Sequence, residues 1–195
     1  MTFQELKKFI AADQYRYEAG RGFKDFLKQW LKESGFRFTV IMRFCAFLRS
    51  HRITRYGTYH VCLWIHRRMQ VRYGVYIEFS TQIGAGLYIG HANSIVINTR
   101  SKIGENCSLS HSVTLGQTHG RSKHPGVPVI GDRVYLGCGA KILGGIHVGN
   151  DVVVAPNAVV TKDVPQSAVI GGIPAKILSV EGSHGYVSNT WSPVF

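Results

Sequence analysis

Residues 130–149 read IGDRVYLGCGAKILGGIHVG, and this short run already shows the repeat that decides the fold. An aliphatic residue returns at every sixth position, at Ile130, Leu136, Ile142 and Val148. The repeat extends over residues 83–165, with a two-residue slip near residue 97 and an interruption between residues 116 and 130. Its other aliphatic members are Ile83, Ile89, Ile95, Ile103, Leu109, Leu115, Val154 and Val160. A helix repeats its apolar residues about every 3.6 positions and a strand about every two, so neither explains a period of six.

The period of six predicts a solenoid of short strands separated by turns. Each aliphatic side chain would point inward. Glycine follows the aliphatic residue at seven of the twelve positions, where it would relieve the backbone at a corner. One coil cannot bury a core by itself, so the coils must stack and stabilise one another. The alternative is a glycine-rich loop region with a chance period, and twelve aliphatic residues in register argue against it.

The 195 residues leave room for this solenoid, at residues 74–178, and for a smaller segment at each end. Residues 117–128 are a polar, basic insertion that we expect to form an exposed loop. Residues 179–195 form a tail that packs on the last coil or on a neighbouring subunit. In residues 1–73 the apolar residues recur with a helical period. We expect helices over residues 23–31, 38–48 and 59–71, with Gly35 ending the first.

The formal net charge of +12 is concentrated in the helical segment. Residues 1–73 hold 15 Lys and Arg against 5 Asp and Glu, which gives +10 and leaves +2 for residues 74–195. Three interpretations stay open: a solvated helical face with a subunit contact, peripheral contact with an anionic membrane surface, or binding of an acidic polymer or nucleic acid. The sequence contains no nucleic-acid-binding motif, which disfavours the last.

The cysteines and the apolar runs indicate in which cellular compartment the protein is expected. Cys45, Cys62, Cys107 and Cys138 have neither disulfide nor metal-ligand spacing, which favours a reducing compartment. Residues 1–6 are polar, so we expect no signal peptide, and no apolar run approaches the roughly 18 residues of a membrane span. We therefore expect a cytoplasmic protein. The histidines lack ligand spacing and carboxylate companions, so no metal site is expected.

Four motifs resemble the hexapeptide acyltransferases, in particular the serine acetyltransferases and the related saccharide O-acetyltransferases. They are Gly90-His91-Ala92, Ser112-Val113-Thr114-Leu115-Gly116, Gly139-Ala140-Lys141-Ile142-Leu143-Gly144 and Gly171-Gly172-Ile173-Pro174-Ala175-Lys176. The resemblance implies a mainly β fold, a left-handed parallel β-helix with three hexads per coil. It also implies a homotrimer with active sites between subunits. Serine acetyltransferases join two trimers through a longer helical N-terminal domain, and the shorter segment here leaves a dimer of trimers open.

With three sides per coil, the hexads are assigned by counting. Ile77 opens side A, Ile83 side B and Ile89 side C, and the insertion is taken to bulge from a corner without using a side. Side C then holds Ile89, Leu109, Leu136 and Val154. Two residues beyond these lie His91, His111, Cys138 and Pro156, which form one outward column. At about 4.8 Å per coil the column spans roughly 14 Å, a length suited to a pantetheine arm.

The resemblance assigns the general base to His91. A hydroxyl is a poor nucleophile at neutral pH, and an imidazole can remove its proton as it attacks. The acetyl group would pass directly from acetyl-CoA to the acceptor, and the same histidine would protonate the departing thiolate. His111, one coil away, would polarise the thioester carbonyl, bind the acceptor or have a structural role only. Cys107 is expected to be an inert core thiol.

Two positions depart from the serine acetyltransferase pattern. Tyr76 stands where that family has the Asp that orients the base, and Gly90 stands where it has an Asp that helps to hold the serine amino group. Glu78 is the candidate to take over the orienting role, or a backbone carbonyl holds the ring. An ammonium group without anionic partners binds weakly, so these departures disfavour serine as the acceptor but not a neutral sugar hydroxyl.

Matching the family motifs assigns further residues to the two substrates. Lys123 and His124 of the insertion, with Tyr76, are expected on the acceptor side. The residues expected to bind acetyl-CoA are Cys138, Gly139, Ala140 and Pro156 along the pantetheine, Thr161 and Lys162 near the nucleotide, and Lys176 at a phosphate. The first three would act largely through backbone groups.

The sequence therefore predicts an acetyl-CoA-dependent O-acetyltransferase that modifies a saccharide hydroxyl, on a polysaccharide or a lipid-linked glycan precursor. Serine O-acetyltransferase is the alternative enzyme, and a non-catalytic solenoid used for assembly or binding is the alternative of another class. The predicted partners are further copies of this chain, the saccharide and, for residues 1–73, an anionic membrane surface.

Overall fold

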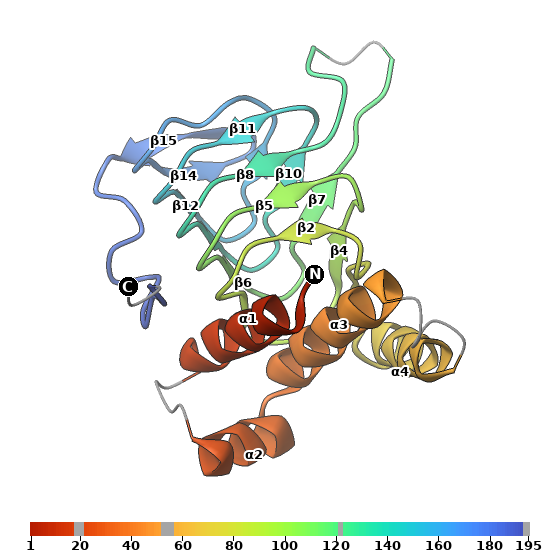
Figure 1. The fold of residues 1–195 in the computed structure, drawn as a ribbon. Coiled ribbons are helices and arrows are strands. Elements are labelled where there is room, and N and C mark those ends of the chain that lie inside the picture. Colours follow the sequence, from red (N-terminus) through yellow and green to blue (C-terminus); the bar gives the residue numbers. More distant parts are fainter. Residues whose placement is uncertain (18–21, 52–56, 121–122, 193–195) are drawn as a thin grey trace.

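The computed structural model describes residues 1–17, 22–51, 57–120 and 123–192. Within these ranges, helices come first and short strands wound into coils follow (Figure 1). The helices are α1 (Phe3–Tyr15), α2 (Phe23–Lys32), α3 (Ser34–Ser50) and α4 (Thr58–Tyr73). The three predicted helices lie within α2, α3 and α4, whereas α1 was not predicted. Residues 18–21 and 52–56 of the predicted helical segment, and 121–122 of the predicted loop, lie outside the described residues.

Three sheets form the sides of the coil, and each of the first four turns adds one strand to each sheet. Sheet A contains β1 (Val75–Tyr76), β4 (Ile95–Ile97), β7 (Thr114–Gly116), β10 (Lys141–Leu143) and β13 (Val159–Val160). Sheet B contains β2 (Gln82–Ile83), β5 (Lys102–Ile103), β8 (Val129–Ile130) and β11 (His147–Val148). Sheet C contains β3 (Tyr88–Ile89), β6 (Ser108–Leu109), β9 (Tyr135–Leu136), β12 (Val153–Val154), β14 (Val169–Gly172) and β15 (Ala175–Ser179). The final pair, β14 and β15, is antiparallel, and the pairs before it are parallel.

The strand register confirms the counted sides. In sheet C, Ile89 pairs with Leu109, Leu109 with Leu136, and Leu136 with Val154. These side chains are at most 1% exposed, so the aliphatic residue of each hexad does fill the interior. The insertion leaves the coil between β7 of sheet A and β8 of sheet B, and it uses no side. The predicted left-handed parallel β-helix with an N-terminal helical segment is the observed fold (Figure 1).

Close contact between coils explains the glycines that begin the corners after sheet B. Gly84, Gly104 and Gly131 follow residues that pair in register, so they lie above one another. A Cβ atom on Gly104 would lie 2.6 Å from the carbonyl carbon of Gly131, which leaves no room for a side chain. These three glycines do not have a left-handed backbone. Other corner residues do, among them Asn106 (φ 56°) and Asn157 (φ 57°).

The start of α3 packs directly on the first coil. Gly35 lies in the first turn of α3, and a Cβ atom there would overlap the carbonyl oxygen of Ile89 and the hydroxyl of Tyr17. The prediction that Gly35 ends the preceding helix is therefore wrong. Helix α2 ends at Lys32, and the chain turns at Glu33, which has an extended backbone. The glycine is needed for a close approach between helix and strand, which the local sequence pattern does not reveal.

Substitution of Gly35 by alanine tests this packing. We expect Gly35→Ala to lower the free energy of unfolding by about 1–3 kcal/mol, because the backbone of Ile89 cannot move aside as a flexible side chain would. Urea unfolding at a fixed protein concentration measures the change. Gly57→Ala is the matched control, since a Cβ atom on Gly57 meets nothing within 4 Å. Equal stability of the two variants would contradict the prediction.

A buried ion pair joins α1 and α3 to the first coil. The Nε atom of Arg43 lies 3.1 Å from Oδ2 of Asp13, and the two side chains are 5% and 0% exposed. Arg43 also donates to the carbonyl oxygens of Ile83 (2.8 Å) and Gly84 (2.6 Å). Asp13 accepts from the backbone N–H of Leu87 at 2.8 Å. Burial raises the pKa of the Asp13 carboxyl, and the Arg43 guanidinium opposes that rise.

The C-terminal tail returns along the coils of its own chain. The Ser183 hydroxyl donates to the Arg133 carbonyl oxygen at 2.6 Å. Farther along, the side-chain amide of Asn106 donates to the backbone carbonyl oxygen of Trp191 (3.0 Å) and accepts from the backbone N–H of Trp191 (2.8 Å). The Trp191 ring also lies under the ammonium of Lys8 in α1. Across the described residues, none of the helices combines the length and apolar character that a membrane crossing requires.

Candidate active site

The predicted outward column is present at the corner between sheets C and A. His91 lies two residues after β3 and His111 two residues after β6. Their ring centroids are 6.0 Å apart, and both side chains are exposed. The column continues through backbone hydrogen bonds, from Gly139 N to His111 O (3.0 Å) and from Asn157 N to Cys138 O (2.8 Å). The register thus brings His91, His111 and Cys138 together on successive coils, and Pro156 follows in the next coil.

The structure places Glu78 away from His91 within one chain. Tyr76 pairs with Val96, so Glu78 lies beyond the end of the strand, at the corner that leads to sheet B. His91 precedes β4 at the opposite corner, so the two residues lie at opposite ends of the sheet A strands. Burial lowers the pKa of His66, and the negative charge of Glu78 partly opposes this by raising the pKa of the same ring. Within a single chain, Glu78 therefore has no place as the group that orients His91.

At the position before the base, where the serine acetyltransferase pattern has a carboxylate, this chain has Gly90 beside the Tyr88 ring. A Cβ atom on Gly90 would lie 3.3 Å from Cε1 of Tyr88. Tyr76 is half exposed on the outer face of sheet A, next to Val96. Neither position supplies a negative charge near His91.

The insertion places Lys123 and His124 at a different corner from the histidine column. Its base is closed by paired hydrogen bonds between Thr118 and Gly126, at 3.0 and 3.1 Å. The His124 carbonyl oxygen accepts from the Thr118 hydroxyl at 2.7 Å and from Gly145 N at 2.9 Å. The loop leaves the end of sheet A that faces sheet B, whereas His91 lies at the end that faces sheet C. One chain therefore does not bring His124 and His91 together, and a site that unites them needs two copies.

The predicted cofactor residues fall into two groups. Thr161, Lys162 and Lys176 line one groove of about 410 Å³ at the last coils, with both lysines exposed. Two cations at one groove suit the phosphates of CoA. Ala140, in contrast, is buried, and its N–H donates to Gly137 O (3.1 Å). The Gly139 N–H donates to the His111 carbonyl oxygen of the neighbouring coil, so both of these N–H groups already have partners. Contact of Cys138, Gly139 and Ala140 with the pantetheine through their backbone groups stays a prediction.

Three of the four cysteines are buried. Cys107 is buried, and burial raises the pKa of its thiol to about 12, as expected for a core thiol. Cys45 of α3 and Cys62 of α4 are also buried, with their Sγ atoms 2.9 Å apart. Sequence spacing did not predict that pair, since it depends on how the two helices pack. Among the described residues, no group of three or more His, Cys, Asp or Glu side chains is arranged to hold a metal ion.

Comparisons with known proteins show where these features recur. The family described as bacterial transferase hexapeptide (six repeats) matches residues 128–162. A serine acetyltransferase of Mycobacterium tuberculosis is 42% identical over 107 residues, which are 54% of this chain and 45% of that protein. A serine acetyltransferase of Helicobacter pylori is 42% identical over 106 residues, 54% of this chain and 61% of that protein. The chain spans about half the length of the curated relatives it matches.

A solved structure extends the match to most of the chain. The Neisseria gonorrhoeae serine acetyltransferase in complex with serine has 30% sequence identity and a TM-score of 0.72, over 91% of this chain and 70% of that chain. The match covers the coils and reaches into the N-terminal helices, since 91% of the chain exceeds the repeat region alone. Repeat period, strand register and fold agree, and the chain therefore belongs to the hexapeptide-repeat acyltransferases.

Proposed function

We propose that this chain is an acetyl-CoA-dependent O-acetyltransferase with His91 as its general base. The observation that carries the proposal is the column at one corner of the coil. Its exposed histidine pair stands at one end, and Cys138 and Pro156 continue it toward the coils that hold Lys162 and Lys176. A solved serine acetyltransferase from Brucella abortus strain S19 in complex with coenzyme A, at 29% identity and a TM-score of 0.74 over 91% of this chain and 69% of that one, supports CoA as the co-substrate.

The proposed transfer occurs in one displacement. The His91 imidazole removes the proton of the acceptor hydroxyl as its oxygen attacks the thioester carbonyl. The new C–O bond forms, the C–S bond breaks, and the protonated His91 then gives its proton to the CoA thiolate. His111, one coil away, polarises the thioester carbonyl or binds the acceptor. No acyl-enzyme is needed, in keeping with the buried position of Cys107.

A homotrimer would complete the site. Because one chain holds His91 and His124 at different corners, the loop of a neighbouring copy is the proposed source of Lys123 and His124. The same arrangement would give Glu78 of a neighbour a route to His91, or leave a backbone carbonyl to orient the ring.

L-Serine is the acceptor that the comparisons favour, since the matched relatives are named serine acetyltransferases. The comparisons therefore favour serine, the alternative acceptor in the sequence analysis, over the saccharide that was predicted first. A saccharide hydroxyl remains a second candidate because of one specific observation. Gly90 and Tyr76 supply no carboxylate where the serine acetyltransferase pattern has two, and an ammonium group needs anionic partners.

Measured CoA release from acetyl-CoA decides between the acceptors. We expect turnover of the wild-type protein with L-serine or with a member of a panel of neutral oligosaccharides, each tested separately. Turnover with L-serine alone would show that another residue replaces the missing carboxylates. Turnover with a saccharide alone would show that Gly90 and Tyr76 define the acceptor. If acetyl-CoA binds but neither L-serine nor any sugar of the panel releases CoA, both proposed acceptors are excluded, which leaves another acceptor or a non-catalytic solenoid.

Peripheral contact of residues 1–73 with an anionic membrane surface, which would place the protein at the inner face of a membrane, stays a prediction. Helix α2 supports it, because Phe23, Leu27 and Leu31 are exposed beside lysines at positions 24, 28 and 32. Failure to sediment with anionic liposomes at low salt would contradict it.

A further inference from the structure

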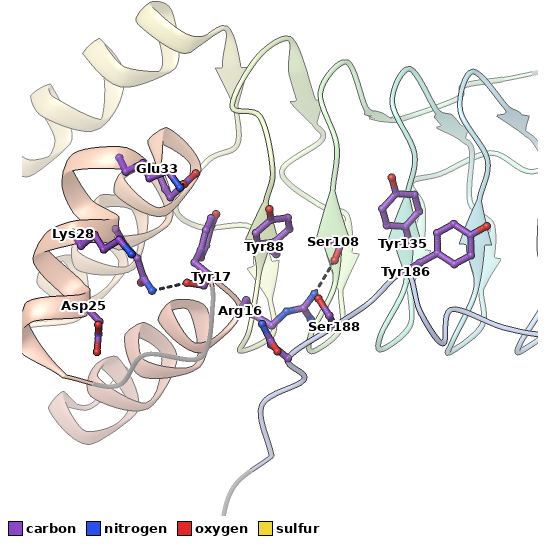
Figure 2. Close-up of a pocket in the computed structure, with 13 residues that line it drawn as sticks. Arg16, Tyr17, Asp25, Lys28, Glu33, Tyr88, Ser108, Tyr135, Tyr186 and Ser188 are labelled. Atoms are coloured by element: carbon purple, nitrogen blue, oxygen red, sulfur yellow. Dashed lines mark hydrogen bonds and ion pairs between the residues drawn. The ribbon is translucent and has the colours of Figure 1, made fainter.

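A pocket of about 370 Å³ lies on the outer face of sheet C, between α2 and the C-terminal tail (Figure 2). We call it the sheet C pocket. Its floor carries Tyr88, Ser108 and Tyr135, the outward residues of β3, β6 and β9, which pair in register. The Tyr186 ring of the tail lies against Tyr135, with centroids 5.4 Å apart. Figure 2 shows the tyrosine rings spread along one face of successive coils.

Two buried polar groups in the wall of the sheet C pocket need a partner. Arg16 is 5% exposed and donates through its terminal nitrogens to Asn106 O (2.6 Å) and Ser108 Oγ (2.8 Å). Its Nε has no hydrogen-bond partner among the described residues. Gln29 is 7% exposed and donates to Tyr17 O at 2.6 Å, and its Oε1 likewise has no partner in the described part of the chain. A buried donor and a buried acceptor without partners are unfavourable, and a ligand or an ordered water at the pocket wall would offer partners that the described residues do not supply.

The floor of the pocket leads to the histidine column. The Tyr88 ring lies beside Gly90, the residue before His91, and its Cε1 atom is 3.3 Å from the position that a Cβ atom of residue 90 would take. The Tyr135 hydroxyl lies 3.3 Å from the Ser110 hydroxyl, the residue before His111. Both tyrosines therefore extend from the pocket toward the corner that holds the two histidines. A ligand in the pocket would lie on a surface continuous with the proposed acceptor position.

The charge of the rim argues against a highly anionic ligand. Lys28 and Lys32 of α2 lie on the rim with Asp25 of the same helix and with Glu33, which follows it, and the ammonium of Lys32 lies 3.5 Å from the Glu33 carboxylate. The opposed charges nearly cancel, and Arg16 already donates to two oxygen atoms of the chain. Aromatic faces beside amide, guanidinium and hydroxyl groups suit a ring that is apolar on its C–H face and polar at its edge, which describes a sugar.

We infer that the sheet C pocket binds a neutral oligosaccharide, through stacking on its tyrosines and hydrogen bonds to Arg16 and Gln29. The pocket is also larger than a single small amino acid requires, and its volume is in the range of ligand-sized sites. Binding stands on the pocket itself. The further role, in which the pocket positions a sugar hydroxyl beside His91, rests on the proposed acetyl transfer.

Saturation-transfer NMR with a panel of neutral trisaccharides, maltotriose, cellotriose and triacetylchitotriose among them, tests the binding. We expect the wild-type protein to bind at least one of them and Tyr186→Ala to weaken that binding by about tenfold, because one stacking surface is lost. Tyr186 is largely exposed, so its removal should not unfold the protein. His184→Ala is the matched control, since His184 is exposed in the same tail and does not line the pocket. Lys28→Ala and Lys24→Ala form a second pair, with Lys28 lining the pocket and Lys24 exposed outside it on the same helix.

The outcomes separate this inference from the proposed function. If no trisaccharide binds, or if Tyr186→Ala and Lys28→Ala bind as the wild type does, the pocket inference is overturned whatever the enzyme transfers. If a trisaccharide binds and the two pocket variants lose it, the pocket is confirmed. CoA release with that sugar then tests its role as an acceptor, and turnover only with L-serine, unchanged in Tyr186→Ala, would remove that role while leaving the binding site.

Discussion

Replacement of His91 by alanine is expected to slow acetyl transfer from acetyl-CoA by roughly 10²- to 10⁴-fold, the usual contribution of a positioned general acid–base group. Without the imidazole, the hydroxyl proton has no acceptor as the C–O bond forms, and the thiolate has no donor as the C–S bond breaks. The affinity for CoA should be nearly unchanged, because the groove lined by Lys162 and Lys176 belongs to the last coils. Steady-state CoA release, with the dissociation constant of CoA measured separately, checks both parts.

A second histidine variant provides the control. His147 is exposed on β11 of sheet B, away from the corner that holds His91, so His147→Ala should turn over as the wild type does. His111→Ala separates the two members of the pair, whose rings lie 6.0 Å apart. Near-normal turnover of His91→Ala, with a large loss in His111→Ala, would assign the base to His111. Near-normal turnover of both variants would exclude this corner as the reaction site.

Replacement of Arg43 by methionine is expected to lower the free energy of unfolding by about 3–5 kcal/mol. The variant keeps an apolar stem but leaves the Asp13 carboxyl, which is 0% exposed, without its guanidinium partner. The carbonyl oxygens of Ile83 and Gly84 lose their donors at the same time. Urea unfolding followed by circular dichroism measures the loss, at one protein concentration because oligomerisation would shift apparent stability.

Two further variants show whether the buried charge is the cause. Arg67→Met removes an exposed arginine of α4 and should change stability by no more than about 0.5 kcal/mol. Combining Asp13→Leu with Arg43→Met removes the uncompensated charge and should recover part of the loss, although the Leu87 N–H then lacks its acceptor. An Arg43→Met protein as stable as Arg67→Met would show that the ion pair adds little to the attachment of the helices.

The candidate site was predictable where it belongs to the repeat. His91, His111, Cys138 and Pro156 were placed in one column by counting hexads, and the pairing of Ile89, Leu109, Leu136 and Val154 confirms the count. The same counting did not show which backbone groups stay available. The Gly139 N–H donates to His111 of the neighbouring coil and the Ala140 N–H to Gly137 of its own turn, so both already have partners inside the solenoid. The tyrosines of the sheet C pocket occupy ordinary outward positions of their hexads, which gave no reason to single them out.

The coil, its three sides and the order of residues along each side could all be predicted from the repeat. A regular repeat converts position in the chain into position in space, since each hexad contacts the hexad of the next coil. Only the tertiary structure decided what the non-repeating segments touch. Gly35 meets the backbone of Ile89, and the tail returns past Arg133 to Asn106. Arg16 meets Ser108, more than ninety residues away. No local period encodes such contacts, because they depend on how helices and tail dock on a surface that the coils must first create.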